Sequence, residues 1–112
     1  MGLEPSCLYT LKDEVPALVP TAAARAVADR AVMLEEFVDR AWAEGRELPL
    51  TEASAVGSVM VHGHCHQKAF GAMPPVLEVL RLIPGAEPTL IESSCCGMAG
   101  SFGYDAAHYA VS

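Results

Sequence analysis

Apolar and polar residues alternate with helical spacing through most of the N-terminal half of the chain. Between residues 21 and 44 an apolar side chain returns every three or four positions, and charged residues occupy the opposite face. The apolar positions of this stripe are Val27, Ala31, Leu34, Val38 and Ala41. Thr21 is a suitable N-cap, and Gly45 is placed to end the helix. We therefore predict one long helix over residues 21–44.

Shorter segments with helix-like or strand-like patterns follow one another along the rest of the chain. In order, they predict a helix over residues 8–18 that Pro16 bends or interrupts, a strand over 56–62, a helix over 74–82, a strand over 88–92 and a helix over 105–111. The strand over 56–62 carries no charge and is rich in β-branched residues, which favours a buried position in a parallel sheet. The strand over 88–92 is expected to be buried as well.

This alternation of helices and strands is typical of a parallel sheet covered by helices. We predict an α/β fold, a Rossmann-like layer with a short parallel sheet flanked by helices. The 112 residues are an ordinary length for one domain, so residues 1–112 are expected to form a single unit. In such sheets ligands bind beyond the carboxyl ends of the strands, which is where Cys65 and the pair Cys95-Cys96 lie.

Charge and cysteine content narrow the classes of function. Fourteen acidic and seven basic residues give a formal net charge of -7, which disfavours binding to nucleic acid. No apolar run approaches the roughly 18 residues of a membrane helix, and the N-terminus lacks a secretion signal. We expect a cytoplasmic protein, or one held at the inner membrane through its partners. Its four cysteines then indicate reduced thiols used for metal binding, redox chemistry or catalysis.

The first cluster of candidate residues is His62-Gly63-His64-Cys65-His66-Gln67-Lys68, at the end of the first predicted strand. It holds three of the four histidines of the chain. Any one of these histidines is equally well explained as a strand-end residue that bonds to the backbone. Three histidines and a cysteine within five positions favour a chemical role for the cluster.

The second cluster is Cys95-Cys96-Gly97, after the second predicted strand. Adjacent Cα atoms are about 3.8 Å apart, below the roughly 4.4 Å of ordinary disulfides, so the two cysteines are poorly placed to bridge each other. Gly97 permits the sharp turn that lets both thiols face one site, and thiolates bind soft or borderline metals. The competing interpretation is a pair of buried thiols that act as small apolar side chains.

Several chemistries fit these two clusters. Zinc bound by Cys65, Cys95, Cys96 and a histidine such as His62 or His66 is one, although no cysteine pair has the usual C-x2-4-C spacing. An iron–sulfur cluster accepts thiolates from separated loops. The glycines at 97, 100 and 103 could cradle phosphate, but their loop holds no lysine or arginine. A cysteine nucleophile with a histidine base leaves the second adjacent cysteine unexplained.

The spacing of the cysteines resembles a known family. Cys65, then 29 intervening residues, then Cys95-Cys96-Gly97 is similar to the cysteine-rich CCG domain found in heterodisulfide reductase, in the iron–sulfur protein of glycolate oxidase and in anaerobic glycerol-3-phosphate dehydrogenase. The resemblance covers nearly the whole chain. The stretch from His62 to His66 matches the family's H-x-P-C-H motif, except that His64 stands where proline is usual. Residues 95–112 look closest to FAD-linked oxidases of D-2-hydroxy acids.

This resemblance implies electron transfer through an iron–sulfur cluster. It makes Cys65, Cys95 and Cys96 cluster ligands, with Gly97 in the loop that wraps the cluster, and it makes Cys7 a ligand belonging with a preceding CCG repeat. His62 and His66 would tune charge nearby. The implied partners are a flavin-binding dehydrogenase domain or subunit that carries FAD, the preceding CCG repeat, and an acceptor such as a quinone or redox protein. The implied substrates are 2-hydroxy acids or glycerol 3-phosphate-like molecules, and the chain is expected to be a fragment of a larger one.

Overall fold

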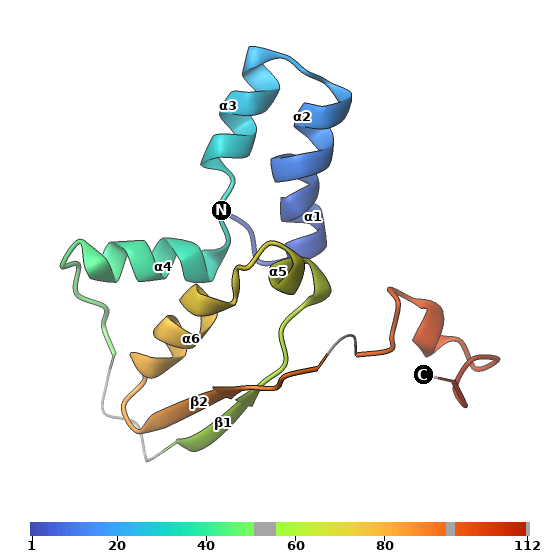
Figure 1. Ribbon diagram of the computed structural model, residues 1–112. Coiled ribbons are helices and arrows are strands. Elements are labelled where there is room, and N and C mark those ends of the chain that lie inside the picture. Colours follow the sequence, from blue (N-terminus) through green and yellow to red (C-terminus); the bar gives the residue numbers. More distant parts are fainter. Residues whose placement is uncertain (51–55, 94–95, 112) are drawn as a thin grey trace.

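The computed structural model describes residues 1–50, 56–93 and 96–111 (Figure 1). As far as the second strand, its helices and strands follow one another in the predicted order. In chain order they are α1 (Pro5–Tyr9), a π-helical turn η1 (Thr10–Glu14), α2 (Val15–Leu18), α3 (Ala22–Arg30), α4 (Leu34–Ala43), β1 (Gly57–Val61), α5 (Cys65–Ala69), α6 (Met73–Arg81), β2 (Ala86–Leu90) and a 3-10 turn η2 (Phe102–Tyr104).

The two strands form a short parallel sheet, and the α/β prediction is confirmed. The register runs from Gly57 opposite Ala86 to Val61 opposite Leu90. Helices α5 and α6 make the crossover between the strands, and α6 lies between β2 and α4 (Figure 1). Above this layer, α1, η1 and α2 form a hairpin with α3 (Figure 1). The helix predicted over 74–82 is confirmed to within one residue at each end.

The prediction that both strands are buried is wrong. Exposed and half-buried residues alternate along β1 and β2, and Met60 is 67% exposed. A two-stranded sheet with α6 packed against β2 leaves its other face open, so only every second side chain meets the helix layer. The second strand also begins and ends two residues earlier than predicted.

The long helix predicted over 21–44 is divided into α3 and α4 by an extended segment. The N-terminus supplies the reason, because Gly2 pairs with this segment as an isolated parallel bridge. The amide of Gly2 donates to the carbonyl of Val32 at 2.9 Å, and the amide of Leu34 donates to the carbonyl of Gly2 at 3.0 Å. The Nζ of Lys12 donates to the carbonyl of Ala31 at 3.0 Å. These partners replace the hydrogen bonds that a continuous helix would make.

Both predicted ends of that segment are confirmed. The Thr21 hydroxyl accepts from the amide of Ala24 at 3.2 Å, as an N-cap does. Gly45 has a φ of +80°, the left-handed conformation that ends helices and that glycine adopts without strain.

The first predicted helix begins three residues early, at Pro5, and runs into α2 through η1. Pro16 has no amide hydrogen to donate, and its ring would crowd a regular α-helical turn. The wider π turn directly before α2 accommodates it, so the proline changes the helix locally without ending it.

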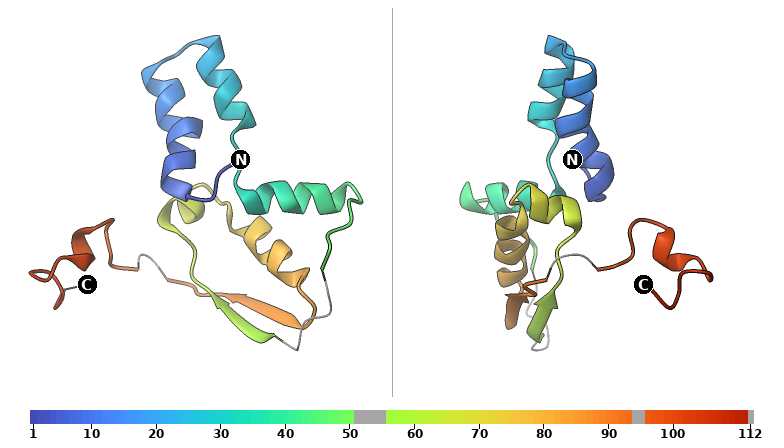
Figure 2. Two further views of the ribbon diagram at one scale, coloured as in Figure 1. Left: turned by 180° about the vertical axis from the view of Figure 1, so that it is seen from behind. Right: turned by 45° about the vertical axis from the view of Figure 1, so that its right-hand side comes forward.

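The helix predicted over 105–111 is absent, because residues 105–111 form turns after η2. The carboxylate of Asp105 accepts from the amide of Ala107 at 2.9 Å, a local bond that competes with helix formation. The rings of Phe102 and His108 stack at 3.8 Å between centroids and fold the segment back on itself. Figure 2 shows this C-terminal segment projecting to one side of the sheet and helices.

The buried core is small and lies where α1 meets the α3–α4 junction and the segment before α6. Its members are Leu8, Tyr9, Ala31, Met33 and Ala72. The radius of gyration is 16.9 Å, whereas a compact domain of this size has about 13 Å. The molecule is therefore an open layer with much of its apolar surface uncovered. None of the helices in the described ranges is both long and apolar enough to cross a bilayer.

Candidate metal centre

The two cysteine-bearing segments meet at one cavity of about 670 Å³ at the carboxyl edge of the sheet. The cavity is lined by the segment after β1, the start of α5, one residue of α1 and the loop after β2. These residues are Ser6, His62, Gly63, His64, Cys65, His66, Gln67, Cys96, Met98, Ala99, Gly100 and Tyr104. The thiols of Cys65 and Cys96 are both exposed to solvent. The volume of the cavity lies in the range of about 300–1,000 Å³ that is typical of small-molecule and cofactor sites.

Cys65 is the first residue of α5, a short helix that the sequence analysis did not predict. The ring Nδ1 of His64 accepts from the amide of His66 at 3.2 Å, and the side-chain oxygen of Gln67 accepts from the amide of His64 at 3.3 Å. This reciprocal capping box starts the helix and fixes the position of Cys65. The signal was present in the sequence, because Gln67 lies three residues after His64.

Gln67 also connects this helix to α4. It is one of the buried polar side chains, and its amide nitrogen donates to the carboxylate of Glu35. A buried amide costs free energy unless both of its ends are hydrogen-bonded, and Gln67 has a partner at each end. The cavity wall that carries Cys65 is therefore fixed to the helical layer. Gln67 belongs to the first candidate cluster of the sequence, but its contact with α4 was not predicted.

The histidines around Cys65 have different surroundings. The Nε2 of His62 lies 3.3 Å from the ammonium nitrogen of Lys68, which can only donate, so this ring nitrogen is the acceptor. His66 stacks on His64 at 5.3 Å between ring centroids. The Nδ1 of His66 is buried and has no hydrogen-bond partner among the described residues. A buried polar atom without a partner on the cavity wall is suited to a ligand or ordered water.

The ring of Tyr9 supports His66 from the core side. Tyr9 stacks on Phe70 at 4.4 Å and lies 6.4 Å from the ring of His66, nearly parallel to both. Burial raises the pKa of Tyr9, and the negative charges of Glu36 and Glu35 raise it further. The phenol is therefore held neutral, and the aromatic stack ties α1 to the helix that carries Cys65.

The loop after β2 forms the other wall of the cavity. Gly97 and Gly100 have φ values of 85° and 69°, in the left-handed region that residues with a side chain disfavour. Gly97 therefore adopts the kind of backbone conformation that a sharp turn was predicted to need. Ala99 also has a positive φ, of 45°. The amide of Gly103 donates to the carbonyl of Met98 at 2.9 Å and closes the loop. Cys95 lies outside the described residues.

Cys7 does not line this cavity. It opens instead into a groove of about 260 Å³ on the other side of α1, together with Glu4. The carboxylate of Glu4 is the N-cap of α1 and accepts from the amides of Ser6 and Cys7. The hydrogen bond from the Cys7 thiol to this carboxylate and its negative charge raise the pKa of Cys7. The hydrogen bond from the amide of Cys7, followed by those from its thiol and from the amide of Ser6, lowers the pKa of Glu4 to about 2.

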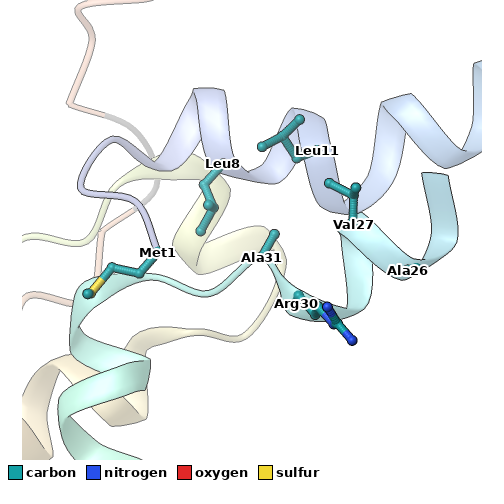
Figure 3. Close-up of a pocket in the computed structure, with 7 residues that line it drawn as sticks. All are labelled: Met1, Leu8, Leu11, Ala26, Val27, Arg30 and Ala31. Carbon is teal, nitrogen blue, oxygen red and sulfur yellow. The ribbon is translucent and has the colours of Figure 1, made fainter. Parts of the chain in front are cut away.

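A third hollow of about 380 Å³ lies between the first helix and α3, away from the cysteines (Figure 3). Its walls are mostly apolar, with Leu8 and Leu11 on one side and Val27 on the other (Figure 3). Arg30 contributes the single charged side chain among the residues that line it. This hollow offers no thiol or imidazole, so it is no candidate for the metal chemistry.

The donor set of the larger cavity fits a soft or borderline metal. Two thiols and three imidazoles line it, and the described lining residues include no lysine or arginine. Within the described residues no group of three or more histidine, cysteine, aspartate or glutamate side chains is gathered closely enough to hold a metal ion. The described part of the site therefore supplies two thiols, one from the start of α5 and one from the loop after β2. The predicted zinc site that includes Cys95 stays a prediction.

The comparisons with known proteins point to one class of dehydrogenase component. The C subunit of the anaerobic glycerol-3-phosphate dehydrogenase of Escherichia coli strain K12 is 33% identical over 107 residues, which are 96% of the chain and 26% of that protein. Its counterpart in Escherichia coli O157:H7 gives the same values. No family model matches the chain, and no solved structure gives a significant match.

The chain spans about a quarter of the length of these curated relatives. The link to glycolate oxidase and to 2-hydroxy acid oxidases is not confirmed by the comparisons. The match over nearly the whole chain shows homology to a segment of the C subunit of anaerobic glycerol-3-phosphate dehydrogenase, and this homology supports the resemblance to the cysteine-rich CCG family.

Proposed function

We propose that the chain is an electron-transfer segment of a flavin-linked dehydrogenase and that it holds an iron–sulfur cluster at the Cys65–Cys96 cavity. The observation that carries this proposal is that thiols from the segments after β1 and β2 line one cavity at the carboxyl edge of the sheet. The homology to a dehydrogenase subunit supports it. A bound iron–sulfur cluster would supply one-electron redox chemistry at this place.

Different residues of the chain would bind such a cluster, shape the loop around it and set the charge nearby. Cys65 and Cys96 would bind as thiolates, together with Cys95. Gly97 and Gly100 turn the loop so that its backbone amides can donate to sulfur, which is how proteins tune such sites. His62 and His66 would set the local charge. Cys7 would serve a neighbouring repeat, since it lines a different groove.

The names of the relatives support one class of substrate for the proposed dehydrogenase. Because the matched proteins are glycerol-3-phosphate dehydrogenase subunits, we propose that electrons come from a glycerol 3-phosphate-like substrate. The 2-hydroxy acid alternative has no support from these relatives. FAD would be carried by a separate dehydrogenase domain or subunit, and the acceptor would be a quinone or a redox protein.

The test uses the dehydrogenase that contains this chain. Cys96→Ser should leave flavin reduction by substrate unchanged and abolish electron passage to the acceptor, with loss of bound iron. Met98→Leu, a volume-conserving change in the same cavity wall, is the matched control and should keep turnover. Full turnover in Cys96→Ser would refute the ligand role of Cys96. Stoichiometric zinc without iron in the native enzyme would favour the zinc alternative.

A further inference from the structure

The ammonium group of Lys68 lies between the carboxyl ends of the two strands. Its Nζ donates to the backbone carbonyl of Ser93 at 2.9 Å and lies 3.3 Å from Nε2 of His62. His62 directly follows β1, and Ser93 lies three residues beyond the end of β2. One side chain from α5 therefore joins both strand ends.

These contacts extend the connection between the strands toward the second cysteine cluster. The backbone ladder ends with the hydrogen bond from the amide of Ile91 to the carbonyl of Val61, at 2.8 Å. The Lys68 contact lies two residues further along, at Ser93, which precedes Cys95 by two residues. A bond at this point fixes where the loop that carries the thiols leaves the sheet.

The path of the Lys68 side chain depends on Gly63. A Cβ atom at Gly63 would lie 3.2 Å from Cγ of Lys68 and 2.3 Å from Sδ of Met73. The missing side chain at this buried position therefore leaves the room in which the lysine stem crosses the end of β1. This close approach explains the glycine in the His62-to-His66 motif.

We propose that Lys68 is a positioning residue that keeps the thiols of Cys65 and Cys96 facing one cavity. It does so by holding the root of the Cys95-Cys96 loop against the helix that begins at Cys65. The hydrogen bonds are charge-assisted, and such bonds are stronger than neutral ones. The redox consequence of this inference rests on the proposed function, whereas its geometric consequence does not.

The geometric test measures how often the two thiols meet in the metal-free chain. In a Cys7→Ser, Cys95→Ser background, Cys65 and Cys96 are the remaining thiols, and dibromobimane reports their proximity by becoming fluorescent when it links them. Lys68→Met should slow cross-linking about three- to tenfold, the effect of losing a solvent-exposed hydrogen bond of ordinary strength. Lys68→Arg keeps the charge and a donor and should restore much of the rate.

Lys12→Met is the matched control. Lys12 is also a lysine that donates to a backbone carbonyl, that of Ala31 at 3.0 Å, but it acts at the α3–α4 junction. This variant should leave the cross-linking rate unchanged. An unchanged rate in Lys68→Met, or an equal fall in Lys12→Met, would overturn the positioning role. If circular dichroism shows that Lys68→Met is unfolded, His62→Ala removes one of the two contacts and should slow cross-linking about twofold.

A second readout uses the protein reconstituted with iron and sulfide. Lys68→Met removes a positive charge beside the site and should lower the reduction potential, because reduction adds negative charge there. Lys68→Arg and Lys12→Met should leave the potential close to that of the wild type. Cross-linking proceeds without iron, so a chain that binds no cluster refutes the proposed function alone. Unchanged cross-linking in Lys68→Met refutes the positioning role alone, whether or not a cluster binds.

Discussion

The two cysteine regions of the molecule hold their thiols in opposite surroundings. Cys7 lies on α1 beside the carboxylate of Glu4, which accepts its hydrogen bond and disfavours the thiolate. Cys65 and Cys96 line a cavity walled by imidazoles and by a glycine-rich loop, without a carboxylate among its described lining residues. The surroundings of Cys7 therefore favour the protonated thiol, whereas Cys65 and Cys96 are candidate metal ligands.

The largest expected effect on stability separates two glycines, one from each region. In the cavity region, Gly63→Ala places a Cβ atom 2.3 Å from the sulfur of buried Met73 and should destabilise the fold by about 1–3 kcal/mol. In the N-terminal region, a Cβ atom at Gly2 would come within 3 Å of only one atom, Cδ1 of Leu8 at 2.9 Å, so a smaller displacement relieves the contact. Gly2→Ala should cost less than about 1 kcal/mol. Urea unfolding of both variants checks this order, and equal losses would contradict it.

A smaller effect is expected at the helical junction of the N-terminal region. Lys12→Met removes the hydrogen bond to the carbonyl of Ala31 and the contact with Glu36 at 3.9 Å. The loss should be about 0.5–1.5 kcal/mol, because both groups are only partly buried. Urea unfolding at neutral pH measures it. A loss of more than about 3 kcal/mol would mean that the junction depends on this lysine more than its contacts indicate.

The N-cap of α1 should make a pH-dependent contribution. The pKa of Glu4 is about 2 in the folded chain and 4.5 in the unfolded reference, so the contribution is fully present above pH 4.5 and lost as the pH falls toward 2. The stability difference between the wild type and Glu4→Gln should therefore shrink through this window. Denaturation at a series of pH values tests it, with Glu87→Gln on the exposed face of β2 as the control. A stability difference between the wild type and Glu4→Gln that does not vary with pH would contradict the pH-dependent contribution of this N-cap.

The subtlest prediction concerns the reactivity of Cys7. Glu4→Gln removes the negative charge and the carboxylate acceptor that raise the pKa of the thiol, so iodoacetamide should alkylate Cys7 faster at pH 8. Cys65 lies in the other region and should react at its wild-type rate. Mass spectrometry of each cysteine-containing peptide separates the two. If alkylation of Cys7 is not accelerated, the carboxylate does not control this thiol.

Local sequence signals predicted the order of the elements and several of their ends. Thr21 and Gly45 act through their own backbone and nearest neighbours, so their roles are visible in the sequence alone. The break between α3 and α4 was not predictable in this way. It depends on Gly2 and Lys12, which are distant in the sequence and meet this segment only in the folded chain.

The candidate site shows the same division. The positions of Cys65 and Cys96 after two parallel strands predicted that both would reach one edge of the sheet, and they line one cavity there. The supporting contacts of Gln67 and Lys68 were missed, because their partners lie on α4 and beyond β2. Spacing within one motif does not reveal which distant residue a side chain will meet.

The most direct test of the central claim is anaerobic reconstitution of the chain with iron and sulfide, followed by metal analysis and a visible absorption spectrum. The wild type and Cys7→Ser should bind iron and sulfide and absorb in the visible range, whereas Cys65→Ser and Cys96→Ser should lose both. This outcome would show that the cavity holds the cluster and that the Cys7 region does not. Undiminished iron in Cys65→Ser and Cys96→Ser, or loss in Cys7→Ser alone, would contradict the account.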